Sequence, residues 1–544
     1  MQHSRLMRSD RIARAFYEML IDVNELPENS QIDCDICVAG SGPAGITIAA
    51  ELVDAPVRVC LVESGGLSPR AAVPAGNVAE QLGVSVDLLK FKHLSFGGAS
   101  NRWGGLRGRW FRLRPMDPLD FETRPWVANS GWPFDYAELE PFYARAGRIL
   151  KVSAGSDFSV VARHAHLAPA FHNDDLHTAI FLMTRPLRFG QHYLDLLTRS
   201  PNVQVYLNGR VVKIEEDPNS PIVRCLHLVT PGGRTHRITA KHFVLACGGL
   251  ENTRLLLASK RKTACGIGNQ RDLVGRYYMQ HPRGLHGAAV LVRNHLCTPL
   301  YTGGYVANDM RISGGISFSE KFQRRQQVLN HCIMLRPLFA ISESYASQVY
   351  RAVERAWYRA DRRSGGRGEL RKLASSAAAA LKQAVGGSGL RTTFAVLNQM
   401  EQIPKPESRL DLSERKDPFG VNQLRIDWRI DPLEKASLCR LHKLVQDRLA
   451  AHGVGKLVSQ LDPLADDWPV SEDSAHHLGT SRMHADPARG VTDAHCRVHS
   501  VHNLYISGGS LFPTGGHANP TLTVVALAVR LADHLKRLYG ASGV

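Results

Sequence analysis

A glycine-rich turn between two apolar segments near the N-terminus limits what this chain can fold into. Residues 35–39 form a short apolar run, which is typical of a buried strand, and the sequence Gly-Ser-Gly-Pro-Ala-Gly follows at 40–45. A helix-compatible apolar stretch covers 46–52, and a second apolar run over 57–62 ends at Glu63. Strand, glycine turn, helix, strand and acid in this order predict a βαβ unit that binds a dinucleotide.

Each glycine of this turn has a physical purpose in that interpretation. Gly40 permits the tight turn, Gly42 lets the backbone approach a pyrophosphate, and Gly45 lets helix and strand pack closely. Ser41 lies in the same turn, and the helix N-terminus that follows faces the phosphates. Glu63 stands where a carboxylate can accept hydrogen bonds from ribose hydroxyls. The alternative is an ordinary βαβ unit that binds no nucleotide, and the turn alone leaves FAD and NAD both open.

The composition is that of an ordinary globular protein. The chain has 544 residues, of which 44% are hydrophobic and 22% charged, which at about 150 residues per domain allows roughly two to four domains. No stretch approaches the roughly 20 uncharged apolar residues of a membrane-spanning helix, although a peripheral membrane contact stays open. The net charge of +17 would suit nucleic acid. Interleaved aromatic and basic repeats are missing, so we expect a solvated basic surface and no nucleic-acid partner.

The cysteines indicate a compartment rather than a site. Ten are scattered along the chain, which favours a reducing environment, and we expect a cytoplasmic protein. Cys34 and Cys37 have the CxxC spacing of metal and redox sites, but they flank a strand signal and no second pair follows. We therefore expect no metal.

Further glycine-rich segments recur along the chain. Residues 97–105 hold four glycines in nine positions and predict a loop with close backbone approach. Residues 243–249 predict a buried strand that ends in glycines, and 251–257 a helix. A helical pattern over 524–538 closes the chain. Before it come three polar and glycine-rich segments: His476 to Thr480, Asn503 to Ser510, and Pro513 to Thr521.

Taken in this order, these segments resemble the glucose–methanol–choline (GMC) oxidoreductases, a family of FAD enzymes. The resemblance runs from about residue 32 to residue 538 and is thin between about 286 and 395. Trp132-Pro133, His281-Pro282 and the segment 401–404 are also similar to that family. Within it, the chain is most similar to the branch that contains pyranose oxidases and bacterial sugar dehydrogenases.

The resemblance implies FAD and gives roles to particular positions. His476 would be the catalytic base and Asn519 its partner across the flavin ring, with hydride passing to flavin N5 from a secondary CH–OH group of a sugar or glycoside. The positions that would contact the cofactor are Gly40, Ser41, Gly42, Gly45, Glu63, Ser100, Trp103, Gly104, Gly105, Val212, Ala246, Gly508, Gly509 and Thr521.

Two departures from the family pattern affect the cofactor. Pyranose oxidases carry a histidine that links covalently to the flavin, and Arg102 stands at that position here, so we expect non-covalent FAD. Many members have an aspartate in the segment that is Ser507-Gly508-Gly509 here. A backbone or water contact would have to replace that carboxylate.

A histidine and an asparagine suit the two tasks of alcohol oxidation. An imidazole with a reference pKa of about 6.5 can take the hydroxyl proton, and a carboxamide can donate a hydrogen bond to the alkoxide. His477 would exchange roles with His476 if the alignment shifted by one residue. His517 would face the same side as Asn519 in an extended loop. We expect His281 to be structural.

The substrate stays open beyond the sugar interpretation. A non-sugar alcohol or sterol, or a non-redox lyase reaction in which FAD only shapes the site, are the alternatives. Oxygen, a quinone or a protein would all fit as electron acceptor, and the oligomeric state is not predicted. Met400, Glu401 and Gln402 are candidates for the pocket, but only alternate residues of a strand share one face.

The positions of the segments predict the architecture. We expect an α/β fold with a Rossmann-like FAD-binding domain built from the discontinuous segments 30–154, 201–285 and 461–544. Residues 155–200 and 286–460 would form an α+β substrate domain, in which the resemblance implies an antiparallel sheet. Within the substrate domain, residues 338–395 are basic and predict a helical insertion of two amphipathic helices with glycine-rich breaks. An exposed insertion, a lid, a dimer arm and a membrane-surface contact are its possible roles.

Overall fold

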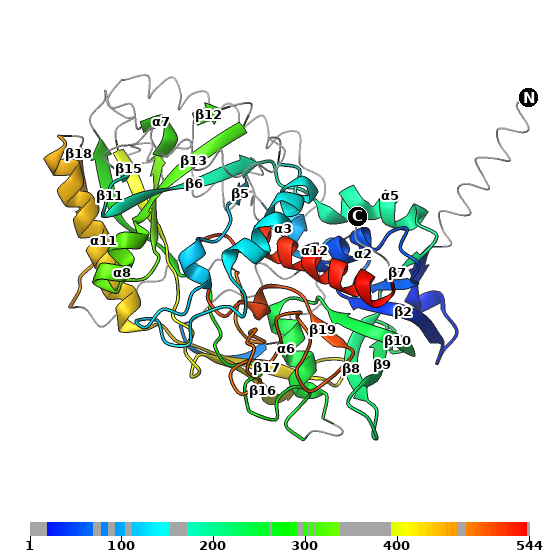
Figure 1. Ribbon diagram of the computed structural model, residues 1–544. Coiled ribbons are helices and arrows are strands. Elements are labelled where there is room, and N and C mark those ends of the chain that lie inside the picture. Colours follow the sequence, from blue (N-terminus) through cyan, green and yellow to red (C-terminus); the bar gives the residue numbers. More distant parts are fainter. Residues whose placement is uncertain are drawn as a thin grey trace, which may run out of the picture.

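The computed structural model contains three β-sheets with helices packed between and around them (Figure 1). The residues that it describes are 19–68, 78–84, 93–103, 111–152, 171–260, 264–291, 298–301, 305–307, 310–337, 393–453, 455–464 and 475–540. None of the helices within these ranges combines the length and the apolar character that crossing a bilayer would need.

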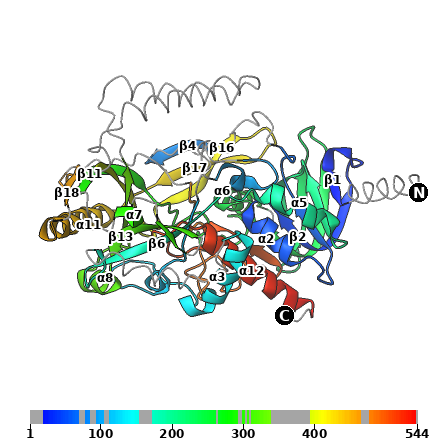
Figure 2. The same cartoon turned by 90° about the horizontal axis from the view of Figure 1, so that it is seen from above.

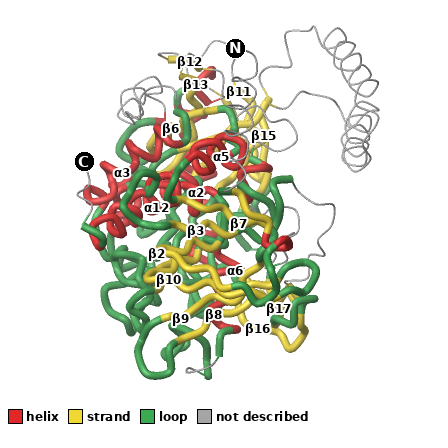
Figure 3. Tube along the Cα trace, turned by 90° about the vertical axis from the view of Figure 1, so that its right-hand side faces the viewer, coloured by secondary structure: helices red, strands yellow, loops and turns green. Residues whose placement is uncertain are grey.

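The first sheet is mostly parallel and contains the predicted nucleotide-binding strands (Figure 3). Its order is β1 (Leu20–Asp22), β7 (Val203–Leu207), β3 (Val59–Val62), β2 (Gln31–Ala39), β10 (Thr235–Leu245), β9 (Val223–Val229) and β8 (Arg210–Glu216), with β19 (Leu504–Ile506) also beside β10. Only β9 runs in the opposite direction, and it pairs antiparallel with both β10 and β8. The continuous apolar runs of β2 and β3 are explained by burial on both faces.

Helices pack against the parallel strands of this sheet. The helix α2 (Pro43–Glu51) starts directly after the glycine turn, with Pro43 in its first turn, where the missing N–H costs nothing. It packs against α12 (Thr521–Leu538), which also packs against α3 (Tyr136–Ile149) (Figure 1). The predicted strands at 35–39, 57–62 and 243–249 and the predicted helices at 46–52, 251–257 and 524–538 all correspond to elements of this layer, the middle helix being α6 (Gly249–Ala258).

The second sheet is antiparallel throughout, as expected for the substrate-domain part of the fold. Figure 1 shows it on the opposite side of the molecule from β2 and β7, with α11 (Pro432–Ala451) along it. Its order is β18 (Gly455–Ser459), β11 (Arg283–Leu291), β15 (Thr393–Gln399), β14 (Cys332–Pro337), β13 (Met310–Phe318), β6 (Leu176–Thr184) and β5 (Phe111–Leu113), with β12 (Tyr305–Ala307) beside β13. The α/β fold with an antiparallel sheet is thus confirmed.

A third, small sheet was not expected. It contains β16 (Arg409–Lys416), β17 (Asn422–Trp428) and β4 (Val78–Gly83), which are visible together in Figure 2. β4 joins parallel to β17 from far away in the sequence. The sheet packs on α6 around the fully buried Trp428.

Two elements pack in a different layer from the one that the expected domain boundaries assign to them. The strand β5, from the segment 30–154, pairs with β6 of the antiparallel sheet. The helix α5 (Phe189–Arg199), from the segment 155–200, packs instead against α2 and β7 of the nucleotide-binding layer. The boundaries therefore stay a prediction. Of the expected insertion at 338–395, residues 338–392 lie outside the described residues, and Thr393 begins β15.

Candidate active site

The first glycine turn has the shape of a cradle for a ligand. Gly40 has a φ of +103°, and a Cβ there would lie 2.6 Å from the carbonyl oxygen of Ala246. A Cβ at Gly45 would lie 1.9 Å from the carbonyl oxygen of Gly40. A Cβ at Gly42, in contrast, would meet nothing within 4 Å. Packing within the protein therefore explains two of the glycines, whereas Gly42 leaves space at a helix N-terminus, as a bound pyrophosphate requires.

The second glycine segment lies directly on the first. The Gly97 N–H donates to the Ser41 carbonyl at 3.0 Å, and a Cβ at Gly98 would lie 2.9 Å from the Gly42 Cα. Ser100 is buried, and its hydroxyl donates to the Gly97 carbonyl at 2.6 Å. The structure thus brings these two predicted cofactor segments together. Gly104 and Gly105 lie outside the described residues.

Trp103 lies at the end of this segment in an aromatic cluster. Its ring stacks on Phe111 with centroids 4.6 Å apart and meets Phe189 edge-on at 5.6 Å. Arg188, which precedes α5, donates to the carbonyls of Ser100 and Trp103 at 2.6 and 2.9 Å. These contacts fix the loop to α5 and β5, and they give the Trp103 ring packing partners within the protein.

Glu63 ends β3, and donors of the protein surround its carboxylate. One oxygen accepts from the Ser41 hydroxyl at 2.6 Å and from the Ser41 N–H at 3.3 Å. The other accepts from Gly65 N–H at 2.9 Å and from the Ser64 hydroxyl at 3.1 Å. A carboxylate has about four acceptor positions. A ribose hydroxyl that binds Glu63 would therefore replace one of the serine hydroxyls.

Val212 occupies an irregular position on the edge strand β8. Its neighbours Val211 and Lys213 pair with consecutive residues of β9, Leu228 and His227, so Val212 opposes no residue of that strand. Such a bulge takes the backbone of one residue out of the ladder. An edge position in a bulge suits the backbone contact to adenine that the resemblance implies.

The segment after β19 offers a polar atom and open space. The Ser507 hydroxyl is buried and has no hydrogen-bond partner among the described residues. Gly508 has a φ of +131°, and a Cβ there would meet nothing within 4 Å. Buried hydroxyls are normally satisfied. This position therefore fits a polar group of a bound cofactor, although the family aspartate is missing.

His476 is brought beside His281 by a short antiparallel bridge. Met279 and Leu478 exchange two backbone hydrogen bonds of 3.1 and 2.9 Å. His281, two residues after Met279, lies opposite His476, two residues before Leu478, and their Nδ1 atoms are 2.8 Å apart. The adjacent His477 points to Tyr278, whose hydroxyl is 2.8 Å from its Nδ1. The structure thus distinguishes the two neighbouring histidines.

Both members of this histidine pair stay neutral near pH 7. Burial lowers the pKa of His476 well below its usual 6.5, and the positive charges that His281, Arg283 and His477 can carry lower it further. Burial likewise lowers the pKa of His281 to about 4. A neutral imidazole is the form that can accept a proton.

Asn519 lies at the antiparallel sheet. Its Oδ1 accepts from Gln399 Nε2 at 2.9 Å and from Arg283 Nη2 at 3.4 Å. Arg283 and Gln399 are cross-strand partners on β11 and β15. Because Arg283 contacts Asn519 and its charge also acts on His476, the two residues expected as a pair belong to one cluster. Two residues after Asn519, Thr521 begins α12.

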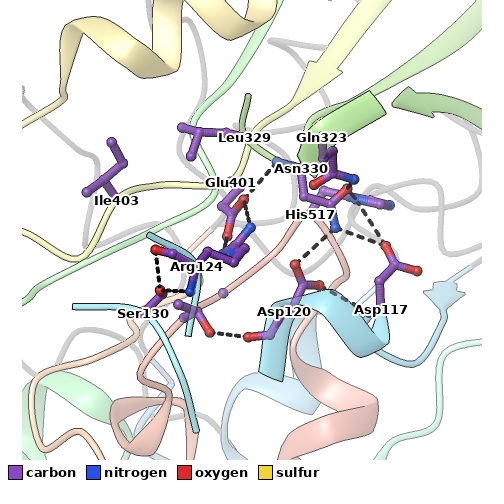
Figure 4. Close-up of polar contacts among 12 residues, drawn as sticks. Asp117, Asp120, Arg124, Ser130, Gln323, Leu329, Asn330, Glu401, Ile403 and His517 are labelled. Carbon is purple, nitrogen blue, oxygen red and sulfur yellow. Dashed lines mark hydrogen bonds and ion pairs between the residues drawn. The ribbon is translucent and has the colours of Figure 1, made fainter. Parts of the chain in front are cut away.

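A buried cluster of charged groups lies around His517, two residues before Asn519, and was not expected from the sequence (Figure 4). Arg124 and Glu401, 277 residues apart, form a fully buried, two-armed ion pair. Asn330 Nδ2 donates to Asp117 and Asp120 at 3.0 Å each, and its Oδ1 is 3.0 Å from His517 Nδ1. Hereafter we call Asp117, Asp120, Arg124, Asn330, Glu401 and His517 the carboxylate cluster.

The carboxylate cluster anchors the loop 514–517, which precedes Asn519. His517 is buried and contacts Asn330, while a Cβ at Gly516 would collide with the Asp120 carboxylate. Thr514 donates to the Asp120 carbonyl. Glu401, a candidate for the pocket, is instead fully engaged with Arg124 and the Asn330 N–H. Burial, together with the nearby Glu401 and Asp117 charges, raises the pKa of Asp120 to about 8.

One group of side chains in the described part of the chain has metal-ligand chemistry. Glu215, Cys225 and His227, on β8 and β9, place one ligand atom each within 4.8 Å of one another. The His227 Nε2 is 2.7 Å from a Glu215 oxygen, and Arg224 Nη1 lies 3.9 Å from the same carboxylate. This hydrogen bond and the adjacent cation account for the cluster without an ion, so we assign no metal to it.

Comparisons with known proteins place this chain among flavin-dependent oxidoreductases. A family model described as GMC oxidoreductase matches residues 404–528, and one described as FAD dependent oxidoreductase matches residues 35–263. The chain is 24% identical to 6'''-hydroxyparomomycin C oxidase of Streptomyces lividus, over 92% of each chain. It is 25% identical to paromamine 6'-oxidase of Streptomyces fradiae, over 92% of this chain and 90% of the relative.

Solved structures support the fold. A crystal structure of formate oxidase covers 95% of this chain and 100% of its own length, with a TM-score of 0.55 and 15% sequence identity. At that identity the likeness concerns the fold alone. Each family model covers a different part of the site, because the first glycine turn lies within one and His476 and Asn519 lie within the other.

Proposed function

We propose that this chain, which belongs to the GMC oxidoreductases and uses FAD, oxidises a secondary CH–OH group of a sugar or glycoside. The observation that carries the proposal is the convergence of a neutral imidazole, His476, and an anchored carboxamide, Asn519, around Arg283. Alcohol oxidation needs a group that takes the hydroxyl proton and a donor for the oxygen that loses it.

The chain's own residues divide this work. FAD, when bound, would supply the hydride acceptor for this oxidation. His476 takes the hydroxyl proton, because burial keeps its imidazole neutral. Asn519 cannot take a proton, but it can hydrogen-bond the oxygen as negative charge develops there.

Residues from both glycine segments and from the C-terminal segment would hold the cofactor. The open space at Gly42 and the orphaned Ser507 hydroxyl support this assignment. We propose non-covalent binding, because Arg102 occupies the position of the linking histidine. The remaining proposed contacts are Gly40, Ser41, Gly45, Glu63, Ser100, Trp103, Gly104, Gly105, Val212, Ala246, Gly508, Gly509 and Thr521.

The sugar or glycoside part of the substrate class is supported by the names of the two long relatives, a 6'''-hydroxyparomomycin C oxidase and a paromamine 6'-oxidase, whereas the secondary position of the hydroxyl is our own proposal. The test is an anaerobic screen in which purified yellow protein is mixed with paromamine, D-glucose, D-fructose, methyl glucosides, simple alcohols and a sterol. Bleaching of the flavin by a sugar, with NMR of the product showing a ring ketone, supports the proposal. Bleaching by simple alcohols or the sterol alone, or a product oxidised at a primary carbon, contradicts the substrate class. A holoenzyme that no compound bleaches favours the lyase alternative.

The role of His476 has its own test. His476→Ala should slow flavin reduction by roughly 10²- to 10⁴-fold while FAD stays bound, because one general base is lost. Stopped-flow absorbance of the flavin measures this. His477→Asn is the matched control, since His477 points to Tyr278, and it should retain most of the rate. If the two variants exchanged these results, the base would be His477.

We also propose that the protein works in a reducing compartment such as the cytoplasm. The nine cysteines among the described residues are all free, including Cys34 and Cys37 on β2. Extracellular proteins more often bridge such residues.

A further inference from the structure

Two hydrogen-bond chains start at backbone carbonyls of the loop 515–517 and end at the proposed catalytic pair. We propose that they fix which atoms of His476 and Asn519 face the alcohol, and that His281 and Gln399 are the positioning residues. The inference rests on the proposed function and adds to it. His281, which the sequence suggested to be structural, acquires a role through His476.

The first chain sets the tautomer of His476. The Gly515 carbonyl can only accept, and it lies 3.3 Å from His281 Nε2, so this nitrogen carries the hydrogen. A neutral imidazole has one N–H, and the Nδ1 of His281 is therefore the acceptor in its 2.8 Å contact with His476 Nδ1. His476 must then carry its hydrogen on Nδ1, and its basic lone pair lies on Nε2.

The second chain sets the orientation of the Asn519 amide. The His517 carbonyl can only accept and a guanidinium can only donate. Gln399 donates from Nε2 to the His517 carbonyl and accepts at Oε1 from Arg283 at 2.8 Å, so its own amide has one possible orientation. The same Nε2 lies 2.9 Å from the Asn519 side chain, which must present its oxygen there. Arg283 donates to that oxygen as well, at 3.4 Å.

Together the two chains give the pair opposite polarity towards the substrate. His476 offers a lone pair at Nε2, which can take the hydroxyl proton, and Asn519 offers its Nδ2 hydrogens, which can stabilise the alkoxide. A reversed Asn519 amide would instead present its oxygen to the developing negative charge. The β-bridge at Met279 and the Arg283–Gln399 cross-strand pair place the two positioning residues.

The tautomer can be read without a substrate. Solid-state ¹⁵N NMR of histidine-labelled holoenzyme distinguishes a protonated from an unprotonated ring nitrogen, and His476→Ala assigns the signals by their loss. We expect Nδ1–H in the wild type and in His281→Asn, whose side-chain oxygen can accept at the same place. His281→Leu should convert a measurable fraction of His476 to Nε2–H. An Nε2–H tautomer in the wild type, or an unchanged tautomer in His281→Leu, overturns the first chain.

The control for this experiment is another buried histidine. The Nε2 of His331 donates to the Glu434 carbonyl at 2.8 Å, and its Nδ1 accepts from the Glu401 N–H at 3.1 Å, so His331 is as buried and as fully bonded as His281. His331→Leu should lower the melting temperature as much as His281→Leu but leave the His476 signals unchanged. A shift of the His476 tautomer in both variants would mean that general loosening causes it, and would also overturn the proposal.

The second chain is tested by the pH dependence of flavin reduction with D-glucose or another sugar of the screen. Gln399→Met should slow reduction roughly 10- to 100-fold with FAD retained, because one orienting hydrogen bond is lost. Gln399→Glu should be as slow at high pH but recover as pH falls, since only the protonated carboxyl can donate to Asn519. A Gln399→Glu rate that equals the wild type at every pH, or that falls with pH in parallel to it, overturns this chain.

The two readouts separate this inference from the proposed function. If no sugar bleaches the flavin, the NMR experiment still reports the tautomer, and the proposed function fails alone. If sugars bleach the flavin but the tautomer is Nε2–H, the inference fails alone. Asn398→Leu is the control for Gln399, because Asn398 neighbours it on β15 but bonds to His286 and His442 instead.

Discussion

The two halves of the site are held by different kinds of contact. In the nucleotide-binding half, backbone meets backbone: the turn at 40–45, the segment at 97–98 and the strand end at Ala246 approach so closely that only glycine fits at several positions. In the proposed catalytic half, side chains contact one another through hydrogen bonds, and the orientation of His476 and Asn519 follows from which partner atoms donate and which accept. Shape should therefore dominate mutational effects in the first half, and donor–acceptor identity in the second.

The largest expected effect is the addition of one methyl group at Gly45. Its Cβ would lie 1.9 Å from the Gly40 carbonyl oxygen, and backbone on both sides must move to admit it. We expect Gly45→Ala to yield colourless or insoluble protein, measured by the flavin absorbance of the purified chain. Gly232→Ala is the control, because its nearest neighbour would be the Thr230 hydroxyl at 3.8 Å. Normal FAD content in Gly45→Ala would contradict a sterically determined cradle.

The next largest effect is expected at the buried ion pair between Arg124 and Glu401, where side chains contact side chains. Glu401→Gln leaves Arg124 buried with an uncompensated charge, which should cost about 3–5 kcal/mol in the free energy of unfolding. Chemical denaturation measures it. The exposed pair Arg324–Glu122 is the control, where Glu122→Gln should change stability by less than about 1 kcal/mol. Equal effects at both sites would show that burial of the Arg124–Glu401 pair does not matter.

A smaller effect separates ligand fit from protein packing. A Cβ at Gly42 would meet no protein atom within 4 Å, so Gly42→Ala should leave the apoprotein's melting temperature within a few degrees of the wild type. It should nevertheless weaken FAD binding by about 1–3 kcal/mol, because the methyl group enters the space for the pyrophosphate. Fluorescence titration of FAD into apoprotein measures the loss. An unchanged affinity would mean that the phosphates lie elsewhere.

The same contrast explains how much could be predicted from the sequence. Steric demands on the backbone leave local signals, because a glycine spacing and an apolar run lie within about 30 residues of each other in a βαβ unit. The parallel sheet, α2, α6 and α12 were therefore predictable. The third sheet was not, since β4 is a mixed polar strand that joins β17 only through the tertiary fold.

The site divides in the same way. His476 and Asn519 could be named because they lie in segments that resemble a family, and their neighbourhood in space is consistent with that. The contact of His281 with His476 depends on the register of a two-residue bridge, and that of Arg124 with Glu401 spans 277 residues. Neither contact leaves a periodic or spacing signal. His281 was consequently interpreted as structural, and the carboxylate cluster was missed apart from Glu401 and His517.

The last expected effect concerns the pH dependence of stability at Asp120. Its pKa is raised to about 8 in the fold, mainly by burial, against about 3.9 in an unfolded chain. The folded state therefore holds the proton more tightly, and this group's contribution to stability is complete below about pH 4 and is lost as pH rises towards 8. Asp120→Asn cannot ionise, so its stability should fall less than that of the wild type between pH 5 and pH 8, as measured by thermal melts at each pH.

In this last experiment the informative quantity is the slope of stability with pH. A constant difference in stability between the two proteins is not informative. Asp120 accepts from the Asp117 N–H on one oxygen and from Asn330 on the other. An asparagine has one oxygen, so its amide nitrogen would face a donor and cost about 1 kcal/mol at every pH. Parallel pH curves for the two proteins would show that Asp120 is ionised in the fold throughout. Charge pairing with Arg124, rather than a protonated Asp120, would then stabilise the carboxylate cluster.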